Sequence, residues 1–145
     1  MLVALLLTAT TTPAPPVTTM GDLHVEVRNI TSTKGDIWIA VFDRADTFLD
    51  DGAQAHGKIY KVTKTGSGTF KLPDVPYGRY ALSVFHDENG NGKLDKNFWG
   101  VPKEPFGFSE GAKAKYSKPA FGDADFEFGA GTGKVVVTLR EWKDQ

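Results

Sequence analysis

The chain of 145 residues contains no cysteine. This absence excludes disulfide bonds, cysteine-ligated zinc and thiol catalysis, so the fold must be held together by burial of apolar surface. It does not fix the cellular compartment, because exported proteins also fold without disulfides. The length corresponds to one domain. The 10 Phe, 3 Trp and 4 Tyr supply large apolar side chains for its core.

An excess of charge of either sign is also missing. The 17 basic residues nearly balance the 18 acidic residues, which leaves a formal net charge of -1. A basic face for nucleic acid is therefore not indicated. No stretch is long and apolar enough to cross a bilayer as a helix. No glycine-rich loop follows a strand and opens a helix, so nucleotide binding is not indicated either.

Residues 1–20 differ from the rest of the chain in composition. A short apolar run at residues 2–7 is followed by small residues, and three prolines exclude a helix over residues 10–20. The pattern predicts a signal-peptide remnant with a cleavage site near Ala9, followed by a Pro/Thr-rich linker. The protein is therefore expected to be exported, either periplasmic or secreted. A charged segment before the apolar run is missing, and a frayed Pro-rich tail is the alternative.

Residues 21–145 are predicted to form a single domain of short strands. Alternating or continuous apolar residues occur between turns that contain Gly, Pro or Asn. Seven strands are predicted, at residues 23–29, 36–42, 58–64, 68–75, 79–86, 124–128 and 134–140. No convincing amphipathic helix is found. This pattern favours an all-β fold, a seven-stranded antiparallel β-sandwich of the immunoglobulin or transthyretin type.

Tyr80 lies in the segment LPDVPYGRYALSV, where Gly78 permits a tight turn. In such sandwiches a tyrosine near this place anchors the entry of a strand through a hydroxyl hydrogen bond. Two interpretations stay open. Tyr80 is either an anchor of this kind or simply a large core residue.

Residues 87–121 contain no clear pattern of a strand or a helix. Loops longer than about 12–15 residues are uncommon, and they are usually functional or disordered. This segment is rich in aromatic residues, in which disordered segments are poor. The aromatic residues are Phe98, Trp99, Phe106, Phe108 and Tyr116. We therefore expect one long ordered loop that folds over an end or an edge of the sandwich.

The start of this loop has the spacing of a calcium-binding loop. Ca²⁺ prefers six to eight oxygen ligands, and side chains at alternate positions of a tightly curled loop point inward. The pattern D-x-N-x-N-G-x-x-D matches the first part of such a loop. The predicted ligands are the side chains of Asp87, Asn89, Asn91 and Asp95 and the backbone carbonyl of Lys93.

The match to an EF-hand is incomplete, because Phe98 stands where an EF-hand has its bidentate Glu. The spacing resembles instead the calcium loops of integrin propeller repeats and of the B-type repeats of staphylococcal surface proteins. Because the set contains only two carboxylates, we expect weak affinity for Ca²⁺, with a dissociation constant of about 10⁻⁴–10⁻³ M. Mg²⁺ is less suited to the site, because an all-protein cage suits it poorly. Asn89-Gly90 and Asn91-Gly92 also favour a plain hairpin turn. A self-capped turn without an ion is therefore the alternative.

The segment GFSEG around Ser109 matches the nucleophile elbow G-x-S-x-G. That elbow needs a strand before it and a helix after it within an α/β-hydrolase. Prolines precede the segment here and the chain is all-β, so we predict no catalytic residue and no enzyme. A small hydrolase that uses Ser109 with His86 and an acid is the alternative. The three histidines show no metal-ligand spacing, and His86 is expected to help shape the loop.

Three stretches carry a resemblance to a known family: LPDVPYGRYALSVF, HDENGNGKLDKNFWGVPKEPFGFSEGA and KPAFGDADFEF. They resemble the bacterial domain-of-unknown-function 2141 family over most of the chain, from Leu23 to Leu139. The most specific part is the Asp/Asn/Gly loop joined to G-x-P-x-E-P-x-G-F-S at Gly100 to Ser109. The resemblance implies a small, exported, β-rich protein without an established activity, and it assigns no catalytic residue. The missing charged segment at the N-terminus is a departure from it.

These observations predict a non-enzymatic binding or envelope-associated module with a calcium-stabilised loop at residues 87–95. The ion would rigidify a loop that presents three aromatic side chains, those of Trp99, Phe106 and Phe108. Lys103 and Glu104 of the same loop are candidates for contact with a polar ligand. In a second interpretation the aromatic residues seal the sandwich, and in a third the protein is a structural or adhesion module without a metal. The ligand or envelope partner is unknown, and no transmembrane helix is expected after signal removal.

Overall fold

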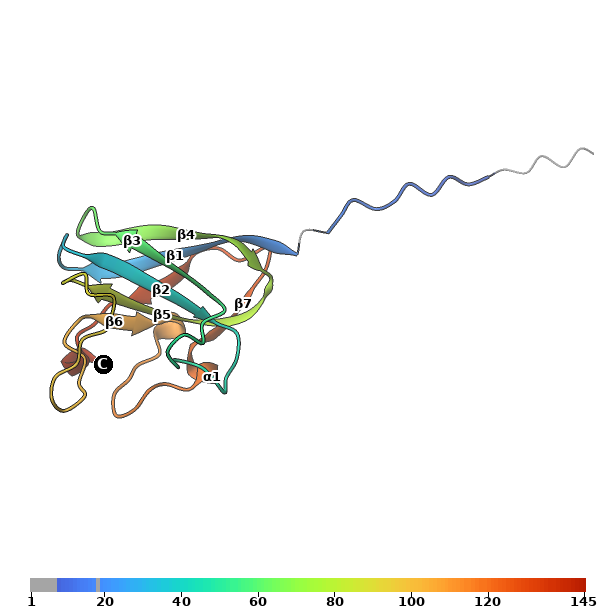
Figure 1. Ribbon diagram of the computed structural model, residues 1–145. Helices are drawn as coiled ribbons and strands as arrows, with labels where there is room; N and C mark the ends of the chain where they lie inside the picture. Colours follow the sequence, from blue (N-terminus) through green and yellow to red (C-terminus); the bar gives the residue numbers. More distant parts are fainter. Residues whose placement is uncertain (1–7, 18) are drawn as a thin grey trace, which may run out of the picture.

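The computed structural model describes residues 8–17 and 19–145. The apolar run at residues 2–7, on which the predicted signal peptide depends, lies outside the described residues. Residues 8–17 contain no strand or helix, and the first strand begins at Met20 (Figure 1). Within the described ranges, no helix has the length and apolarity that crossing a membrane requires.

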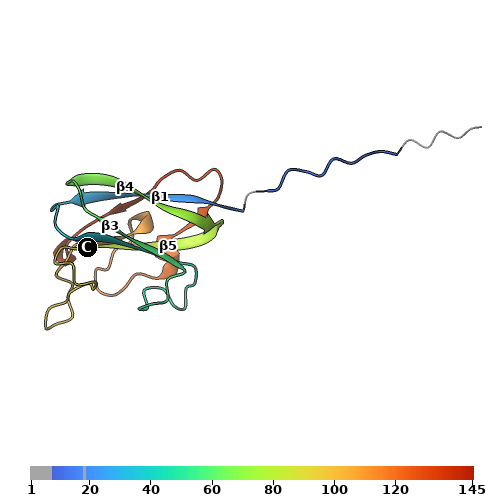
Figure 2. The same cartoon turned by 45° about the horizontal axis from the view of Figure 1, so that its top comes forward.

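The folded part consists of two β-sheets that pack face to face (Figures 1 and 2). One sheet has the strand order β4–β1–β8, and the other has the order β3–β2–β5–β6, with β7 also pairing with β5. The strands are β1 (Met20–Ile30), β2 (Asp36–Phe42), β3 (His56–Lys61), β4 (Gly66–Pro76), β5 (Gly78–Asp87), β6 (Phe106–Phe108), β7 (Asp125–Phe128) and β8 (Val135–Thr138). The helical turns are η1 (Ser109–Gly111), α1 (Phe121–Ala124) and η2 (Trp142–Asp144).

The main core lies between the two sheets and follows from alternation along the strands. In β1, Leu23, Val25 and Val27 are buried, while the residues between them are more exposed. In β5 the buried inner face includes Leu82 and Val84. Since successive side chains of a strand point to opposite faces, the period of two predicted which residues form this core.

The expectation of seven antiparallel strands is wrong in two respects. Eight strands occur in the described chain, and β1 pairs with β8 in parallel, with Val25 opposite Val135 and Arg28 opposite Thr138. Alternation of apolar residues identifies a strand but not its direction. The additional strand, β6, lies within the segment that was predicted to be a loop. Its three residues are all buried, so they show no alternation from which a strand could be predicted.

A second hydrophobic cluster covers the outer face of the five-stranded sheet. Its buried members are Phe42, Ala81, Phe106, Phe108, Ala114, Phe121 and Ala124. Because this sheet is covered on both faces, β2 has apolar residues on both of its sides. The long segment after β5 is therefore ordered, as expected, but it covers an outer face as well as an edge of the sheet.

Tyr80 fulfils both interpretations. Its ring is buried in the main core, and its hydroxyl donates a hydrogen bond to the backbone oxygen of Pro76 at 2.8 Å. The bond spans four residues across the tight turn at Gly78. It fixes the angle at which β5 enters the sheet that positions the loop.

Candidate functional site

The candidate calcium loop begins where β5 ends. It folds back over the outer face of the five-stranded sheet, where the rings of Trp38 and Phe85 stack with their centroids 5.6 Å apart. Gly92 lies against this pair, since a Cβ added to it would be 3.6 Å from the ring of Trp38. The loop therefore rests on a rigid aromatic platform.

Asp87 closes the loop from its first position. Its carboxylate is fully buried and accepts hydrogen bonds from the backbone amides of Asn91 at 3.2 Å and Gly92 at 2.8 Å. Positive φ angles at Gly90 (69°) and Gly92 (81°) allow the sharp turns between them. The glycines therefore curl the chain back onto Asp87, as the motif predicts.

Three further side chains of the predicted ligand set meet one another. The amide nitrogen of Asn89 donates to Asp95 at 2.6 Å, and that of Asn91 donates to both oxygens of Asp95 at 2.7 and 2.9 Å. These bonds from Asn91 and Asn89 lower the pKa of Asp95. The two ends of an Asn amide have nearly the same shape. Rotation of both amides would therefore turn their oxygens toward the centre that their nitrogens now face.

Lys93 enters this network through its backbone amide, which donates to the side-chain oxygen of Asn91 at 3.1 Å. In the described chain no three His, Cys or acidic side chains group as metal ligands. The predicted set contains only two carboxylates, those of Asp87 and Asp95, which is consistent with the weak affinity expected for it. As it stands, the hydrogen bonding is that of a self-capped turn.

Glu104 is the residue of this site that the sequence did not predict as part of it. Its side chain is only 6% exposed, and its two oxygens accept the backbone amides of Glu88 and Asp95, both at 3.1 Å. It therefore joins the two ends of the loop instead of facing a ligand in solvent. Burial raises the pKa of Glu104, and the nearby charges of Asp87 and Asp95 also raise it.

His86 contacts the start of the same loop from within the fold. It is fully buried, with Nε2 lying 2.7 Å from the backbone oxygen of Lys34 and Nδ1 lying 3.8 Å from a carboxylate oxygen of Glu88. It thereby connects the β1–β2 turn to the start of the loop. This is the shaping role that was expected of it.

Ser109 is fully buried, and both functions of its hydroxyl are used within the fold. Its oxygen accepts the backbone amide of Leu82 at 2.8 Å, and the hydroxyl donates to the backbone oxygen of Ala124. No histidine is among its hydrogen-bond partners in the described residues. Its surroundings therefore give no support to the hydrolase alternative.

Replacing Ser109 by alanine is expected to lower the free energy of unfolding by about 1.5 kcal/mol, because the buried amide of Leu82 loses its acceptor. Urea unfolding of the variant measures this loss. The exposed Ser117 is the matched position, and Ser117→Ala should change stability by less than about 0.5 kcal/mol. Equal stability of wild type and Ser109→Ala would contradict the structural role.

The aromatic residues of the long segment divide into two groups. Phe106 and Phe108 are buried in the second cluster, so the sealing interpretation holds for them. Phe98, Trp99 and Tyr116 are 94%, 82% and 86% exposed. The segment therefore presents one pair and one single aromatic side chain to solvent.

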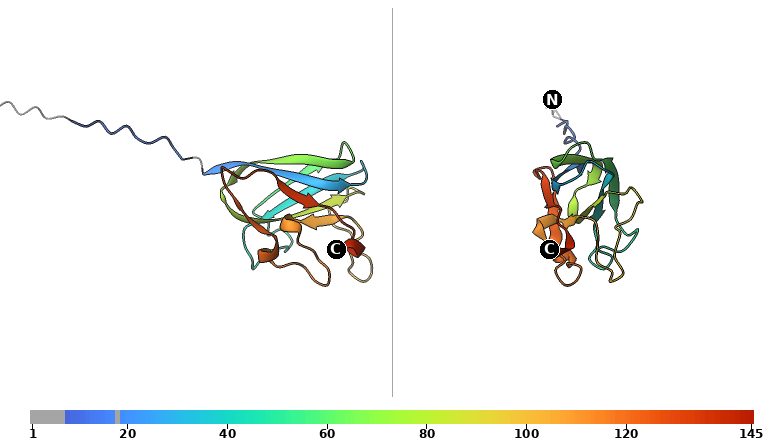
Figure 3. Two further views of the ribbon diagram at one scale, coloured as in Figure 1. Left: turned by 180° about the vertical axis from the view of Figure 1, so that it is seen from behind. Right: turned by 90° about the vertical axis from the view of Figure 1, so that its left-hand side faces the viewer.

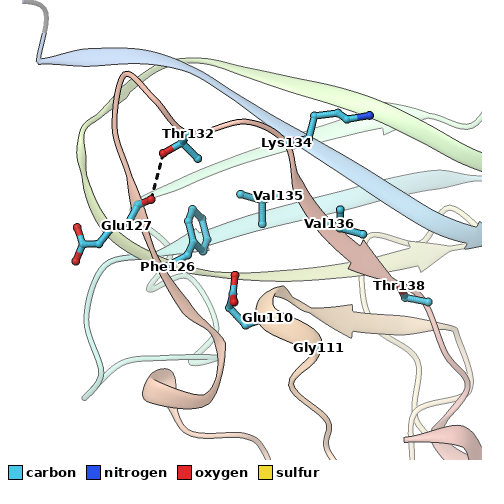
Figure 4. A pocket seen from close by; sticks show the side chains of 9 residues that line it. All are labelled: Glu110, Gly111, Phe126, Glu127, Thr132, Lys134, Val135, Val136 and Thr138. Atoms are coloured by element: carbon cyan, nitrogen blue, oxygen red, sulfur yellow. Dashed lines mark hydrogen bonds between the residues drawn. The ribbon is translucent and has the colours of Figure 1, made fainter.

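A groove of the described structure lies elsewhere, between β7, β8 and η1 (Figure 4). Its volume is about 550 Å³, and none of the predicted site residues lines it. Glu110 points into it toward Phe126 and Val135 (Figure 4), and Lys134 at its rim forms an ion pair with Glu26 at 2.6 Å. The groove and the candidate calcium loop are separate features of the molecule.

Comparison with known proteins yields one match. The model of a family described as "Uncharacterized protein conserved in bacteria (DUF2141)" matches residues 25–136. No curated protein matches the chain. No solved structure matches it either.

Proposed function

The chain belongs to the bacterial DUF2141 family, whose description assigns no activity, and we propose that it is a non-enzymatic binding module whose loop at residues 87–95 holds a calcium ion. The spacing D-x-N-x-N-G-x-x-D together with the meeting of Asn89, Asn91 and Asp95 carries this proposal. Asn89, Asn91 and Asp95 converge on one centre, which Asn89 and Asn91 face with their amide nitrogens. A hard cation requires oxygen ligands, so its binding would require both amides to rotate.

The binding of the ion would exchange one set of contacts for another. Asp95 is satisfied by two amide nitrogens, and a cation at the centre would attract the amide oxygens in their place. Asp87 and the carbonyl of Lys93 would complete the set. Glu104 holds the ends of the loop together through the backbone. The reorganisation is then confined to the two amide rotations, which give up the hydrogen bonds from the backbone amides of Asn91 and Lys93 to the two side-chain oxygens.

Export to the periplasm or the medium is part of the proposal, and its support is the apolar run at residues 2–7 followed by small residues. A sandwich of the immunoglobulin or transthyretin type is proposed for the fold. Its support is the two-sheet architecture and the Tyr80 anchor. Cell fractionation of the full chain tests the first statement, and an experimental structure tests the second.

A thermal melt of the full chain in calcium, magnesium or EDTA tests the ion site. If the dissociation constant is about 1 mM, then about 10 mM Ca²⁺ stabilises the native state by about 1.4 kcal/mol. This corresponds to a rise in the melting temperature of about 3–5 °C. Magnesium at the same concentration should have a smaller effect, because it loses its water reluctantly.

The variants Asp87→Ala and Asp95→Ala should remove the response to calcium. Asp50→Ala is the control, because Asp50 is an exposed aspartate outside the loop. It should keep the full response. The ion site is refuted if wild type shows no response at about 10 mM Ca²⁺, or if Asp95→Ala responds as wild type does.

A further inference from the structure

Residues 96–103, the aromatic finger, project from the candidate calcium loop as a short ordered hairpin. The amide of Lys103 donates to the backbone oxygen of Asp95, and that of Asn97 donates to the backbone oxygen of Val101, both at 2.8 Å. The side chain of Asn97 accepts the amides of Trp99 at 2.9 Å and Val101 at 3.1 Å. The tip is thus fixed by its own hydrogen bonds.

The tip of the finger consists of two adjacent aromatic residues that the fold does not cover. Phe98 and Trp99 are 94% and 82% exposed, and their rings meet edge to face with centroids 5.4 Å apart. Other aromatic residues of the same segment are buried in the second cluster. An exposed apolar patch on a rigid support is typical of an interaction site.

A second loop has the same chemistry as the finger. Residues 112–118 include Tyr116, which is 86% exposed, and the two loops project from the same side of the body (Figures 1 and 3, gold and orange). Neither residues 96–103 nor residues 112–118 contain an acidic residue. Their lysines are Lys96, Lys103, Lys113, Lys115 and Lys118. Each of the two loops is therefore basic and carries exposed aromatic side chains, on a protein whose net charge is -1.

Negative charge gathers on a neighbouring segment. Residues 43–52 contain four aspartates and one arginine, and in Figure 1 this segment lies nearer to α1 than the finger does. Lys118 reaches it through a bond to the backbone oxygen of Leu49 at 3.5 Å. The side that carries the loops is thus basic at the finger and acidic toward α1. A negatively charged surface would meet the finger first.

We propose that the aromatic finger docks the protein onto a bilayer that contains anionic lipids. Tryptophan and tyrosine prefer the interface between water and hydrocarbon, because one part of each ring system is apolar and another is polar. Lysines near the surface add attraction to anionic head groups. A projecting tip with two exposed rings and flanking lysines has the shape and charge for this surface. The inference names the partner of the proposed binding module, but it does not depend on the calcium ion.

Co-sedimentation of the full chain with vesicles tests the inference. Vesicles of phosphatidylcholine alone are compared with vesicles that contain about 30% phosphatidylglycerol, because the lysines respond to anionic lipid. Wild type should bind the anionic vesicles at least about 10-fold more strongly than the neutral ones, and salt near 0.5 M should weaken the binding. The double variant Phe98→Ser/Trp99→Ser should bind at least about 10-fold more weakly than wild type.

Lys96→Glu should weaken binding, whereas the control Lys64→Glu, which lies outside both loops, should not. Tryptophan fluorescence supplies a local readout: addition of anionic vesicles should shift the emission to shorter wavelength in wild type, and the shift should vanish in Trp99→Phe. The apolar run at residues 2–7 is common to all of these chains. Equal binding by wild type and the double variant would therefore show that the two exposed rings do not carry the binding, and it would overturn the inference.

The absence of binding to anionic vesicles would also overturn the docking inference, and a protein would then be the partner to test for the finger. The sedimentation assay is run with calcium and with EDTA, beside the thermal melts. Vesicle binding without a calcium response refutes the ion site alone. A calcium response without vesicle binding refutes the docking inference alone.

Discussion

Alanine at position 35 is expected to lower the free energy of unfolding by at least about 3 kcal/mol. Gly35 has a φ of 71°, and a Cβ added to it would lie 1.9 Å from the backbone oxygen of Asp87 and 2.8 Å from its carbonyl carbon. Neither partner is free to move away. Asp36 pairs with Asp87 in the β2–β5 ladder, and Lys34 contacts His86 through its backbone oxygen at 2.7 Å. The close approach between the backbones of Gly35 and Asp87 is therefore lost in the variant.

Gly90 is the matched control for this substitution. Its φ of 69° is almost the same, but no heavy atom of the described structure would lie within 4 Å of its added Cβ. Gly90→Ala should therefore cost only about 1 kcal/mol, which is the backbone preference alone. Urea unfolding of both variants measures the difference. Similar losses for the two would show that the contact with Asp87 does not cause the effect.

Gly35 shows which features of this fold the sequence could predict and which it could not. Lys34 and Gly35 lie between two predicted strands, at residues 23–29 and 36–42, and a glycine in such a position is a local signal of a turn. The contact with Asp87 arises only when β2 and β5 pair, and no local pattern records it. Strand existence followed from alternation in the same way, as at Leu23, Val25 and Val27. The parallel direction of β8 beside β1 did not, because it depends on the path of the whole chain.

The candidate site divides along the same line. Asn89, Asn91 and Asp95 lie within one curled segment, and their spacing predicted that their side chains meet. The carboxylate of Asp87 bonds to the backbone amides of Asn91 and Gly92 instead. Glu104 approaches the loop from its far end, and it contacts Glu88 across 16 positions of sequence. A single glutamate in a Pro-rich segment gives no local signal for such a contact. Glu104 belongs to no recognised ligand spacing, so the sequence did not reveal its role.

The aromatic residues show a third limit of the sequence. Phe106 and Phe108 flank Gly107, whose added Cβ would lie 2.4 Å from the backbone oxygen of Thr138, and β6 can approach β8 only because this position lacks a side chain. Phe98 and Trp99 are adjacent at a turn, which turns both away from the sheet. Composition alone does not distinguish the two pairs. The two pairs differ because Phe106 and Phe108 belong to β6, which pairs with β5, whereas Phe98 and Trp99 lie in a turn outside the sheet.

Substitution of Glu104 by alanine is expected to open the candidate loop locally. The amides of Glu88 and Asp95 would lose their acceptors, at a cost of about 3 kcal/mol for the two together. Hydrogen exchange of these two amides should accelerate about 100-fold, since each 1.4 kcal/mol corresponds to a factor of about 10. Glu104→Gln keeps one acceptor oxygen, so its effect should be clearly smaller. Unchanged exchange at both amides in Glu104→Ala would show that Glu104 does not hold the loop.

The same carboxyl makes the loop sensitive to pH. Burial, and then the charges of Asp87 and Asp95, raise the pKa of Glu104 in the folded state, so the folded protein holds this proton to a higher pH than the unfolded chain does. Its contribution to stability is therefore fully present below the unfolded pKa, and it is lost as the pH rises through the folded pKa. Asp95, with its lowered pKa, acts in the opposite direction, but it is common to wild type and Glu104→Gln. The stability of wild type relative to Glu104→Gln, measured by urea unfolding, should consequently fall as the pH rises above the ordinary glutamate pKa of 4.5. A difference that rises over this range would mean that the two backbone amides stabilise the carboxylate more than burial disfavours it.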